Sequence, residues 1–363
     1  MRVLICGGGV IGASIAYFLA RRGVQSTVIE RTGIACAASG KSGGFLALDW
    51  CDGTPLAALA RRSFALHASL ADETGGDWGY RRLTTYAGFA ARAGKRRAGG
   101  AHDLAWVADG VTLNHRLGAT QTTAQVHPGR FTAAMMEAAR PHAELRRGRV
   151  TGVARGGASV GGVAVDGEIV KGDAVVIAMG PWSMLAAAWL PLPAVYGLKG
   201  HSLVFDTGTR VPPEALFLEY QEESGAVHAP EVFPRADGTT YVCAISSEGP
   251  VPLDPATVAP DAGAIERLAA MCARLSPVFA ASPILARQAC FRPVTQDGLP
   301  LIGRVPGLAN AYAATGHSVW GMLNAPATGE AMAELIVDGA ARTVDLSAFD
   351  PGRLPPAPRS QRS

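Results

Sequence analysis

The hydrophobic pattern is clearest at the start of the chain, where predicted elements follow one another without a break. Residues 2–6, RVLIC, form a short apolar run typical of a buried strand. Glycines follow, and residues 10–20 then carry apolar side chains at helical spacing up to Gly23. A second strand-like run, QSTVIE, occupies residues 25–30. The order strand, glycine turn, helix, strand predicts the first unit of a Rossmann-like fold.

The glycine turn carries the candidate chemistry of this unit. Gly7, Gly9 and Gly12 match the spacing G-x-G-x-x-G. Glycines at these places allow a tight turn, close approach of a pyrophosphate and close packing of the helix on the strand. The helix N-terminus at Val10 and Ile11 would direct free N–H groups and a positive dipole at the phosphates. The motif therefore predicts dinucleotide binding.

An acidic residue ends the second strand where such folds bind a ribose. Glu30 lies roughly twenty residues after the turn, and its carboxylate would accept hydrogen bonds from ribose hydroxyls. The same charge would repel a 2′-phosphate, which disfavours NADP. Its neighbour Arg31 is a further cofactor candidate. The alternative is a glycine turn in an ordinary α/β protein, but the position of the motif between strand and helix argues against it.

A second loop rich in glycine and serine, residues 35–50, indicates which dinucleotide to expect. A nicotinamide dehydrogenase would continue with regular strand–helix alternation. This loop instead offers further backbone N–H groups and small hydroxyls, suited to a second phosphate and a flat ring, which favours FAD. Its candidate cofactor residues are Ser39, Lys41, Ser42, Gly43 and Gly44.

Later segments alternate between two kinds of pattern. Short alternating strands joined by turns dominate residues 77–121 and 194–286, which predicts an antiparallel sheet. We therefore predict an α/β protein in which a smaller substrate domain, built from these two segments, is interleaved with a Rossmann-like FAD-binding domain. The FAD-binding domain is discontinuous and comprises residues 1–76, 122–193 and 287–345. The polar, Pro-rich residues 346–363 are predicted to be a flexible tail.

Composition narrows the class of protein without changing this picture. With 363 residues, 48% of them hydrophobic and 17% charged, the chain is typical of a globular enzyme of two domains. The net charge is only +3, and the short basic runs at 95–97 and 140–149 indicate solvated loops rather than nucleic-acid binding. Six scattered cysteines lack zinc-like spacing, so no metal site is expected. With a strand so close to Met1, no leader is expected, and the prediction is a cytoplasmic protein.

The uncharged stretch at residues 174–198 is long enough to cross a membrane. Gly180-Pro181 and two later prolines interrupt it, so we expect a buried strand, a turn and a short helix, with no membrane span. Ala178 and Gly180 end the strand with small residues, where the backbone must approach something closely. Both are cofactor candidates.

Five separated segments resemble FAD-dependent oxidoreductases of the D-amino acid oxidase and glycine oxidase superfamily, and together they cover nearly the whole chain. They are the glycine fingerprint with Glu30-Arg31, SGKSGG, QVHPGRF, DAVVIAMGPWS, and CFRPVTQDGLPLIG followed by AATGHSVWGMLNAPATGEAMAELI. The variants KSGGFLALDWC and ATGHSVWGMLNAPATG are most similar to poorly characterised oxidoreductases of fungi and plants. The resemblance implies FAD as cofactor, a small amino or hydroxy acid as substrate, and oxygen or another electron acceptor.

The resemblance also implies further cofactor contacts. In this family the flavin's pyrimidine oxygen meets the N-terminus of the last long helix, whose dipole would stabilise the anionic reduced flavin. Pro326 places the start of that helix near residues 321–324, because proline is tolerated only in the first turn or so. The implied contacts, including a backbone contact from Val150 to the adenine, are at Val150, Trp182, Gly316, His317, Gly321 and Met322.

The predicted chemistry depends on Arg292, which precedes a proline in an apolar stretch. The proline favours an extended backbone, and a guanidinium in such surroundings needs an anionic partner. In glycine and D-amino acid oxidases an arginine in an RP motif of this kind holds the substrate carboxylate, and the resemblance gives Arg292 that role. A bidentate pair would aim the Cα–H of an amino acid or secondary amine at flavin N5. The alternative is a structural ion pair with a protein carboxylate, for which the candidates are Glu219, Glu231 and Asp297.

Other pocket residues and other activities stay open at this point. Tyr241 and Arg235 lie on predicted strands of the substrate domain, and alternation alone leaves open which face they occupy. We take Arg292, Tyr241 and His317 as the candidate catalytic residues. An FAD-dependent dehydrogenase of a 2-hydroxy acid or polyol phosphate would need a base, either His317 or His201. A flavin-binding regulatory protein is a further alternative.

Cys290 raises one more possibility. It matches the spacing C-x-x-x-x-T-x-D, in which monomeric sarcosine oxidases bind flavin covalently through the cysteine. The Arg-Pro that follows departs from that pattern, so a buried, inert thiol is favoured. Lys41 and Lys199 are the lysines nearest the predicted flavin and pocket loops, where a lysine could assist oxygen reduction.

Overall fold

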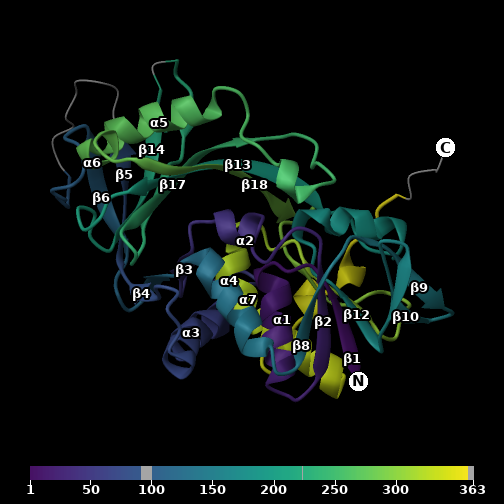
Figure 1. Cartoon of the computed structure of the whole chain (residues 1–363). Helices are drawn as coiled ribbons and strands as arrows, with labels where there is room; N and C mark the ends of the chain where they lie inside the picture. The colour runs from purple at the N-terminus through teal and green to yellow at the C-terminus, as the bar shows by residue number, and fades with distance from the viewer. Residues whose placement is uncertain (91–99, 223, 359–363) are drawn as a thin grey trace.

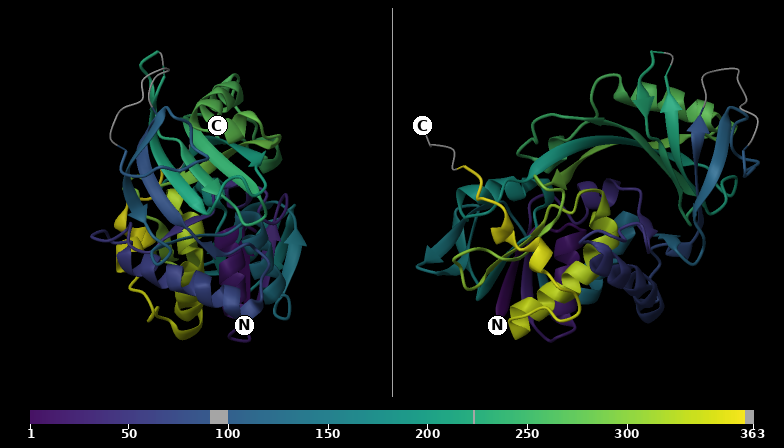
Figure 2. Two further views of the ribbon diagram at one scale, coloured as in Figure 1. Left: turned by 90° about the vertical axis from the view of Figure 1, so that its left-hand side faces the viewer. Right: turned by 180° about the vertical axis from the view of Figure 1, so that it is seen from behind.

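The computed structural model describes residues 1–90, 100–222 and 224–358 and confirms the α/β class. A parallel sheet with its helices forms one part of the molecule, and a larger, curved antiparallel sheet arches over it (Figures 1 and 2). The helix α2 (Ala38–Lys41) lies between the two parts.

Among the described residues, the parallel sheet has the strand order β19-β20-β12-β1-β2-β8. All its pairings are parallel except that of β19 with β20. The bounds are β1 (Arg2–Cys6), β2 (Gln25–Glu30), β8 (Ala143–Arg147), β12 (Ala174–Ile177), β19 (Leu301–Arg304) and β20 (Ala311–Thr315). The four residues Val3 to Cys6 are completely buried, as expected for a central strand covered on both faces.

The two faces of this sheet pack against different layers. Val3 and Ile5 face a core shared with α1 (Val10–Ala20), α3 (Ala57–Thr74), α4 (Pro128–Ala139) and α7 (Gly321–Asp338). Leu4 and Cys6 face a second core. That core is closed by the 3-10 helix η1 (Gly180–Ala188) and by a three-stranded sheet of β9 (Val150–Gly156), β10 (Ser159–Val165) and β11 (Glu168–Lys171).

One local expectation was wrong. The basic run at residues 140–149, predicted as a loop, contains β8, which pairs in parallel with β2 at the sheet edge. Its two consecutive arginines remain near solvent, with Arg146 half-buried and Arg147 exposed, and Arg146 pairs with Glu168 at 3.1 Å. The other basic run, 95–97, lies outside the described residues.

The larger sheet contains eight strands among the described residues, in the order β18-β13-β17-β16-β14-β5-β6, with β15 paired to β14. Only β14 and β5 pair in parallel. The bounds are β5 (Thr84–Ala90), β6 (Val111–Gly118), β13 (Tyr196–Asp206), β14 (Glu214–Gln221), β15 (Val227–His228), β16 (Glu231–Pro234), β17 (Thr239–Ser247) and β18 (Ile284–Val294). β18 stays in this sheet beyond residue 287, where we placed a domain boundary, so Arg292 stands on the large sheet.

One face of the large sheet packs against α5 (Ala264–Leu275) and α6 (Pro277–Ala280). The opposite face is turned toward the parallel sheet (Figure 2, right). A small sheet of β3 (Phe45–Ala47), β7 (Thr123–Gln125) and β4 (Arg81–Arg82) joins the two parts. The cavity described below is therefore roofed by one sheet and floored by the loops of the other.

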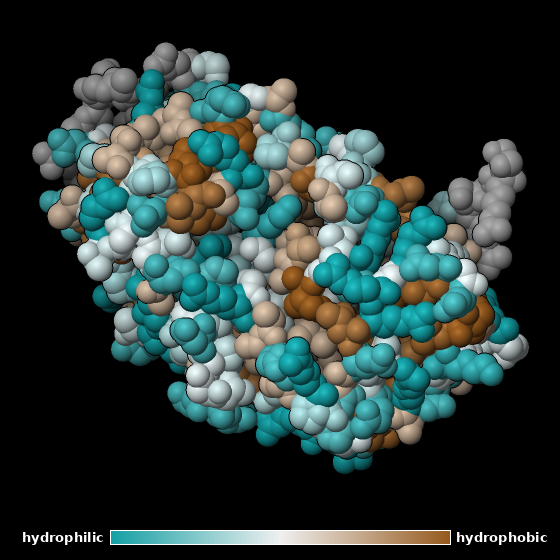
Figure 3. Space-filling view, viewed as in Figure 1, coloured by the Kyte–Doolittle hydropathy of each residue, from teal (hydrophilic) through white to brown (hydrophobic). Residues whose placement is uncertain are grey.

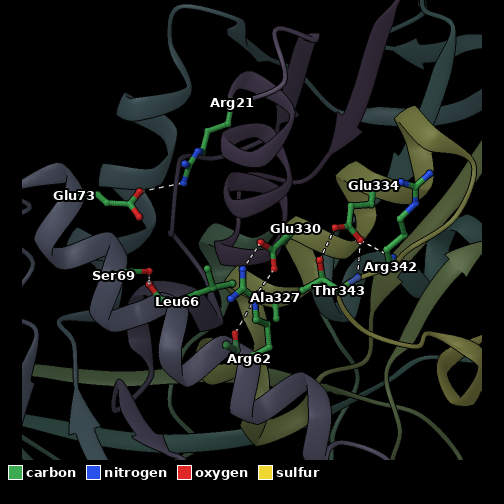
Figure 4. A network of polar contacts seen from close by, with 11 residues as sticks. Arg21, Arg62, Leu66, Ser69, Glu73, Ala327, Glu330, Glu334, Arg342 and Thr343 are labelled. Carbon is green, nitrogen blue, oxygen red and sulfur yellow. Dashed lines mark hydrogen bonds and ion pairs between the residues drawn. The ribbon is translucent and has the colours of Figure 1, made fainter.

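Polar contacts tie α3 to the helices beside it (Figure 4). Arg62 of α3 makes a bidentate pair with Glu330 of α7 at 2.8 and 2.6 Å. Arg21, just after α1, bonds Glu73 near the end of α3 at 3.1 Å. These contacts fix α3 alongside the helix predicted to meet the flavin.

The chain end is attached to the fold up to Ala357, whose N–H bonds the Leu192 carbonyl at 2.8 Å. It forms the turns η4 (Ser347–Phe349) and η5 (Pro351–Arg353), and Phe349 is completely buried. Arg353 binds Asp297 at 2.7 Å. The predicted flexible tail began at residue 346, and its last residues, 359–363, lie outside the described part of the chain. In the described part, no helix combines the length and apolar character needed to cross a bilayer.

Candidate active site

Two cavities meet between the sheets. The outer cavity, of about 380 Å³, is lined by Glu30, Val150 and Trp182, and the inner cavity, of about 330 Å³, by Tyr241 and Arg292. Both are lined by the residues of one junction, Gly9, Ala38, Ser39, Ala178, Gly180 and Pro181. Figure 3 shows apolar residues in the middle of one face, between the two parts of the molecule. An elongated site in two chambers has the outline that a dinucleotide requires.

The glycine turn at the junction has the geometry predicted for it. Gly7 has a φ of +114°, and a Cβ there would lie 2.4 Å from the Ala178 carbonyl oxygen. A Cβ on Gly12 would overlap the Gly7 carbonyl oxygen. The N-terminus of α1 consequently comes against the cavity, and Ser39 Oγ accepts a hydrogen bond from Val10 N at 2.8 Å. The second loop is thereby held against the first.

Glu30 holds the turn from the other side. Its carboxylate accepts hydrogen bonds from the N–H groups of Gly8 and Thr32, each at 2.8 Å. Oε1 also accepts hydrogen bonds from Gly33 N at 3.3 Å and the Cys36 thiol at 3.9 Å, whereas Oε2 accepts only the Gly8 bond among the described residues, so capacity for a ribose hydroxyl remains at Oε2. Arg31 also lines the outer cavity, but its guanidinium bonds the Leu253 carbonyl at 2.7 Å and pairs with Asp254 at 3.2 Å.

The floor of the inner cavity is the start of α7. Gly321 and Met322 begin this helix and line the cavity together with His317. His317 is buried, and its Nε2 bonds Thr328 Oγ1 at 3.1 Å while its Nδ1 has no partner among the described residues. Burial lowers the pKa of His317 to about 3, so the ring is neutral at physiological pH.

The roof of the inner cavity is a row of neighbouring positions on four strands. Directly opposed residues in an antiparallel sheet share a face, and the register opposes Phe233 to Tyr241 and Glu231 to Cys243. β13 pairs with β18 along its other edge, and there Gly200 of β13 opposes Cys290 of β18. The row therefore brings side chains from β16, β17 and β18, with Gly200 of β13 between them, to one surface above the floor.

Arg292 reaches into this roof across Gly200. A Cβ on Gly200 would lie 3.0 Å from an Arg292 guanidinium nitrogen, so the missing side chain provides the space that the guanidinium occupies. Arg292 Nη1 donates to Ser246 Oγ at 3.4 Å. No carboxylate among the described residues forms an ion pair with it, and Asp297 is bound by Arg353 instead. The guanidinium is half-buried and lines the cavity.

Glu231 is the acidic group of the inner cavity. Its carboxylate accepts a hydrogen bond from the Cys243 thiol at 3.5 Å. Burial raises the pKa of Glu231, and the positive charge of Arg292 opposes that rise. Arg292 and Glu231 thus line the same cavity, and no ion pair joins them among the described residues.

Aromatic side chains close the end of the inner cavity. Phe233 stacks on Phe45 at 5.2 Å and on Tyr241 at 6.1 Å, measured between ring centroids. Trp50 meets Phe217 edge-on at 4.8 Å. Burial raises the pKa of Tyr241 well above its usual value, so its hydroxyl stays protonated. These rings exclude water and strengthen the electrostatic interactions of the charged pair.

Most residues predicted for the site line one of the two cavities. Those that do are Gly7, Gly9, Val10, Ile11, Glu30, Arg31, Ser39, Ser42, Gly43, Gly44, Val150, Ala178, Gly180, Trp182, Tyr241, Arg292, His317, Gly321 and Met322. Those that do not are Gly12, Lys41 and Gly316. Lys41 Nζ donates to the Ala289 carbonyl at 3.2 Å, and Gly316, with a φ of +79°, packs against Thr295.

The remaining pocket candidates lie partly inside and partly outside the inner cavity, because side chains alternate between the two faces of a strand. Cys290 lines the inner cavity, and burial raises the pKa of its thiol. Arg235 lies behind Tyr241 and donates to the Ser42 carbonyl at 3.0 Å. Lys199 and His201 point to the other side of β13, where Lys199 pairs with Asp261 at 2.5 Å and His201 bonds the Ile245 carbonyl at 3.1 Å.

Sequence reasoning considered Glu231 only as an ion-pair partner of Arg292 and did not consider Gly200. The signal for Glu231 was present, because Asp237-Gly238 is the turn of the β16–β17 hairpin and pairing outward from it opposes position 231 to position 243. For Gly200 no such local signal existed.

The chemistry of the site fits FAD. The glycine turn accepts a close-lying pyrophosphate, and the N-terminus of the 11-residue helix α1 faces it. In the inner cavity Ser42 Oγ is buried without a hydrogen-bond partner among the described residues, so it is free to bind a ligand. The start of α7 would meet the ring.

Comparisons with known proteins agree with this geometry. Residues 2–335 match the family described as FAD dependent oxidoreductase, DAO. An oxidoreductase of Schizosaccharomyces pombe is 30% identical over 378 residues, which cover 96% of this chain and 97% of that protein. Glycine oxidase of Geobacillus kaustophilus is 27% identical over 384 residues, covering 96% and 95%. Iminodiacetate oxidase of Chelativorans sp. shares the fold, with a TM-score of 0.78 at 22% identity over 96% of this chain and 99% of that chain.

Proposed function

Since the chain belongs to the DAO family of FAD-dependent oxidoreductases and uses FAD, we propose that it oxidises a small amino acid or secondary amine to an imine. The observation that carries the proposal is the placement of Arg292 in the inner cavity without a carboxylate partner among the described residues. The relatives named above as oxidases of glycine and iminodiacetate support an amine bearing a carboxylate.

The residues of the inner cavity have different roles in the proposed reaction. Arg292 would bind the substrate carboxylate through two parallel hydrogen bonds, which fix orientation as well as charge. The aromatic wall of Phe233, Tyr241 and Phe217 limits the size of the substrate and excludes water. FAD, when bound, supplies the acceptor for the hydride from the substrate Cα. The neutral, buried His317 helps shape the floor on which the ring would rest.

The oxidation of a hydroxy acid or polyol phosphate is less well supported. It needs a base for the hydroxyl proton, and the two histidines considered for that task are unsuited, which leaves Glu231 as the candidate base in the inner cavity. His201 faces away from the cavity, and its Nε2 accepts a hydrogen bond from the Asp261 N–H at 3.1 Å. His317, with a pKa of about 3, binds protons weakly.

An anaerobic absorbance scan tests the proposal. The purified yellow protein is mixed in turn with glycine, sarcosine, D- and L-amino acids and 2-hydroxy acids, and bleaching of the flavin band is followed. We expect bleaching by a small amine. In Arg292→Ala the amine concentration for half-maximal rate should rise about 100-fold, since a hydrogen bond to a charged group contributes roughly 1.5–3 kcal/mol. Oxygen consumption in the same mixtures prepared aerobically tells whether oxygen is the acceptor.

Arg287→Ala is the matched control, because Arg287 lies on the same strand, is exposed and points to the opposite face. It should leave the amine concentration dependence unchanged. Bleaching by hydroxy acids alone would refute the proposal in favour of the dehydrogenase. Very slow bleaching by every compound would refute it in favour of a regulatory flavoprotein.

A further inference from the structure

Among the described residues, the inner cavity is lined by one guanidinium and one carboxyl group, those of Arg292 and Glu231. No ion pair joins them in the described part of the chain. Arg292 alone suffices to bind a carboxylate, so the proposed function leaves Glu231 without a task. A half-buried acid is costly unless something cationic or hydrogen-donating meets it, and among the described residues Glu231 has only the weak donor of the Cys243 thiol.

Building on the proposed amine oxidation, we propose that Glu231 faces the substrate nitrogen, binds it as an ammonium ion and takes up the proton that it must lose. Amino acids are ammonium ions at neutral pH, whereas loss of hydride from Cα requires the nitrogen lone pair. In this step an N–H bond breaks and its electron pair stays on nitrogen. The proton forms an O–H bond with a Glu231 carboxylate oxygen.

The geometry supports this pairing. Arg292 starts on β18, crosses Gly200 and ends at Ser246 of β17. Glu231 stands on the neighbouring strand β16, opposite Cys243, which lies three residues from Ser246 along β17. The two side chains therefore start at different places on the sheet, but both line the inner cavity. In an α-amino acid the nitrogen and the carboxyl carbon are separated by only about 2.5 Å, since both are bonded to Cα. A small zwitterion whose carboxylate binds Arg292 thus carries its nitrogen within the cavity that Glu231 lines.

Substrate binding would itself increase the proton affinity of Glu231. The titratable or charged groups around it are Arg292, Cys290, Tyr241, Cys243 and His317, with Lys41 behind Cys290. Burial keeps the tyrosine and both thiols protonated and the histidine neutral. Arg292 is therefore the cation that stabilises ionised Glu231. A substrate carboxylate that neutralises Arg292 removes this stabilisation while it brings an ammonium proton alongside.

Arg292 and Glu231 together predict a class of substrate. The pocket selects a small zwitterion whose nitrogen is attached to the carbon that bears the carboxylate. A 2-hydroxy acid of the same size would satisfy Arg292 but place no cation at Glu231. A monocarboxylate such as acetate would bring an anion close to an unprotonated acid.

The pH dependence of anaerobic flavin reduction tests the inference. The substrate is whichever small amine bleaches the wild type, and pH is varied from 6 to 10. Wild type should accept the ammonium form, so reduction at low substrate concentration changes little with pH. Glu231→Gln has to capture the scarce neutral amine. It should react at least about 30-fold more slowly at pH 7 and gain roughly tenfold per pH unit up to the pKa of the amine, as one-proton titration requires.

A binding measurement gives a second readout that needs no turnover. Acetate is titrated into the wild-type holoprotein by calorimetry in two buffers of different ionisation enthalpy near pH 7. Acetate on Arg292 should be accompanied by proton uptake at Glu231, and the uptake should vanish in Glu231→Gln. Glu219→Gln is the matched control, because Glu219 is an exposed carboxylate on the neighbouring strand β14.

The outcomes are distinguishable. If amines bleach the wild type but Glu231→Gln keeps the wild-type pH profile, the role of Glu231 is wrong and the proposed function stands. If acetate binds the wild type without proton uptake, the role of Glu231 is likewise wrong. This measurement on the wild type is decisive even if Glu231→Gln fails to retain flavin. If no amine bleaches the wild type at any pH, the proposed function itself is wrong.

Discussion

A buried histidine that contacts the start of α7 should make the stability of the protein sensitive to acid. His67 lies on α3, completely buried, and its Nε2 donates hydrogen bonds to the carbonyl oxygens of Met322 at 3.0 Å and Leu323 at 3.2 Å. Pro326 has no N–H, so it cannot bond the Met322 carbonyl four residues earlier in α7. His67 supplies the missing donor. One turn earlier on α3, Ser63 Oγ accepts a hydrogen bond from Ala327 N at 3.1 Å.

The size of the effect follows from the pKa of His67, which burial lowers from 6.5 to about 4. The folded value lies below the unfolded one, so the unfolded chain binds the proton first. This contribution to stability is therefore complete above about pH 6.5 and is lost as the pH falls toward 4. One pKa unit corresponds to about 1.4 kcal/mol, which gives a loss of about 2.5 kcal/mol between pH 7 and pH 4.5.

The assay compares the slope of stability against pH in two proteins. With an unfolding entropy of about 2.1 cal/mol/K per residue for 363 residues, a loss of about 2.5 kcal/mol corresponds to a Tm shift of about 3 °C. His67→Leu keeps the volume but not the titration, so its Tm should fall about 3 °C less than that of wild type from pH 7 to pH 4.5. The lost hydrogen bonds also change the Tm of His67→Leu at pH 7. This constant difference does not enter the comparison of slopes. Replacement of the exposed His115 should leave the slope unchanged, and an equal slope in His67→Leu would refute the reasoning.

Three further predictions follow from the packing of glycines and of the chain end. Gly12→Ala should leave the purified protein with little bound flavin, measured as absorbance per protein, because its Cβ would overlap the Gly7 carbonyl; normal flavin content would contradict this. Gly200→Ala should raise KM for the amine about tenfold with kcat nearly unchanged, since its Cβ displaces the guanidinium from its place in the roof. Arg353→Ala should lower stability by about 1 kcal/mol in urea unfolding, because Asp297 loses the partner that holds its pKa at about 2; no change would show that the chain end is loosely attached.

The parts of the fold that rest on local patterns were predictable. The strand, turn and helix at the N-terminus, the helix start near Gly321 and the extended backbone at Arg292 each follow from neighbouring residues. Glycine and proline limit the backbone directly, and helical or alternating spacing is visible within a few residues. The run at 140–149 failed for the opposite reason. Its basic composition indicates a loop, but an edge strand can hold charged residues near solvent.

The candidate site was predictable only in part, because contacts between strands depend on register. Arg292 was found through its motif, whereas the role of Glu231 follows only when position 231 is paired with position 243. Lys41 shows the converse case. Its place in a cofactor loop suggested a cofactor contact, yet its side chain turns toward β18 and bonds the Ala289 carbonyl. Which face a loop side chain occupies is decided by packing that local sequence does not contain.

A bulge in β17 explains why simple alternation misplaces one residue of the roof. Gly200 opposes Ser246, but two residues later on β13 Ser202 opposes Cys243, so β17 contains one extra residue between these pairs. Regular alternation from Cys243 would turn Ser246 away from the cavity. The bulge reverses the phase, directs Ser246 Oγ to the guanidinium of Arg292 and leaves Ile245 in the core under α5. Bulges occur beside active sites because they re-aim side chains in this way. The position of the Arg292 guanidinium thus depends on two backbone features of neighbouring strands, the bulge of β17 and the missing side chain at Gly200, as much as on the arginine itself.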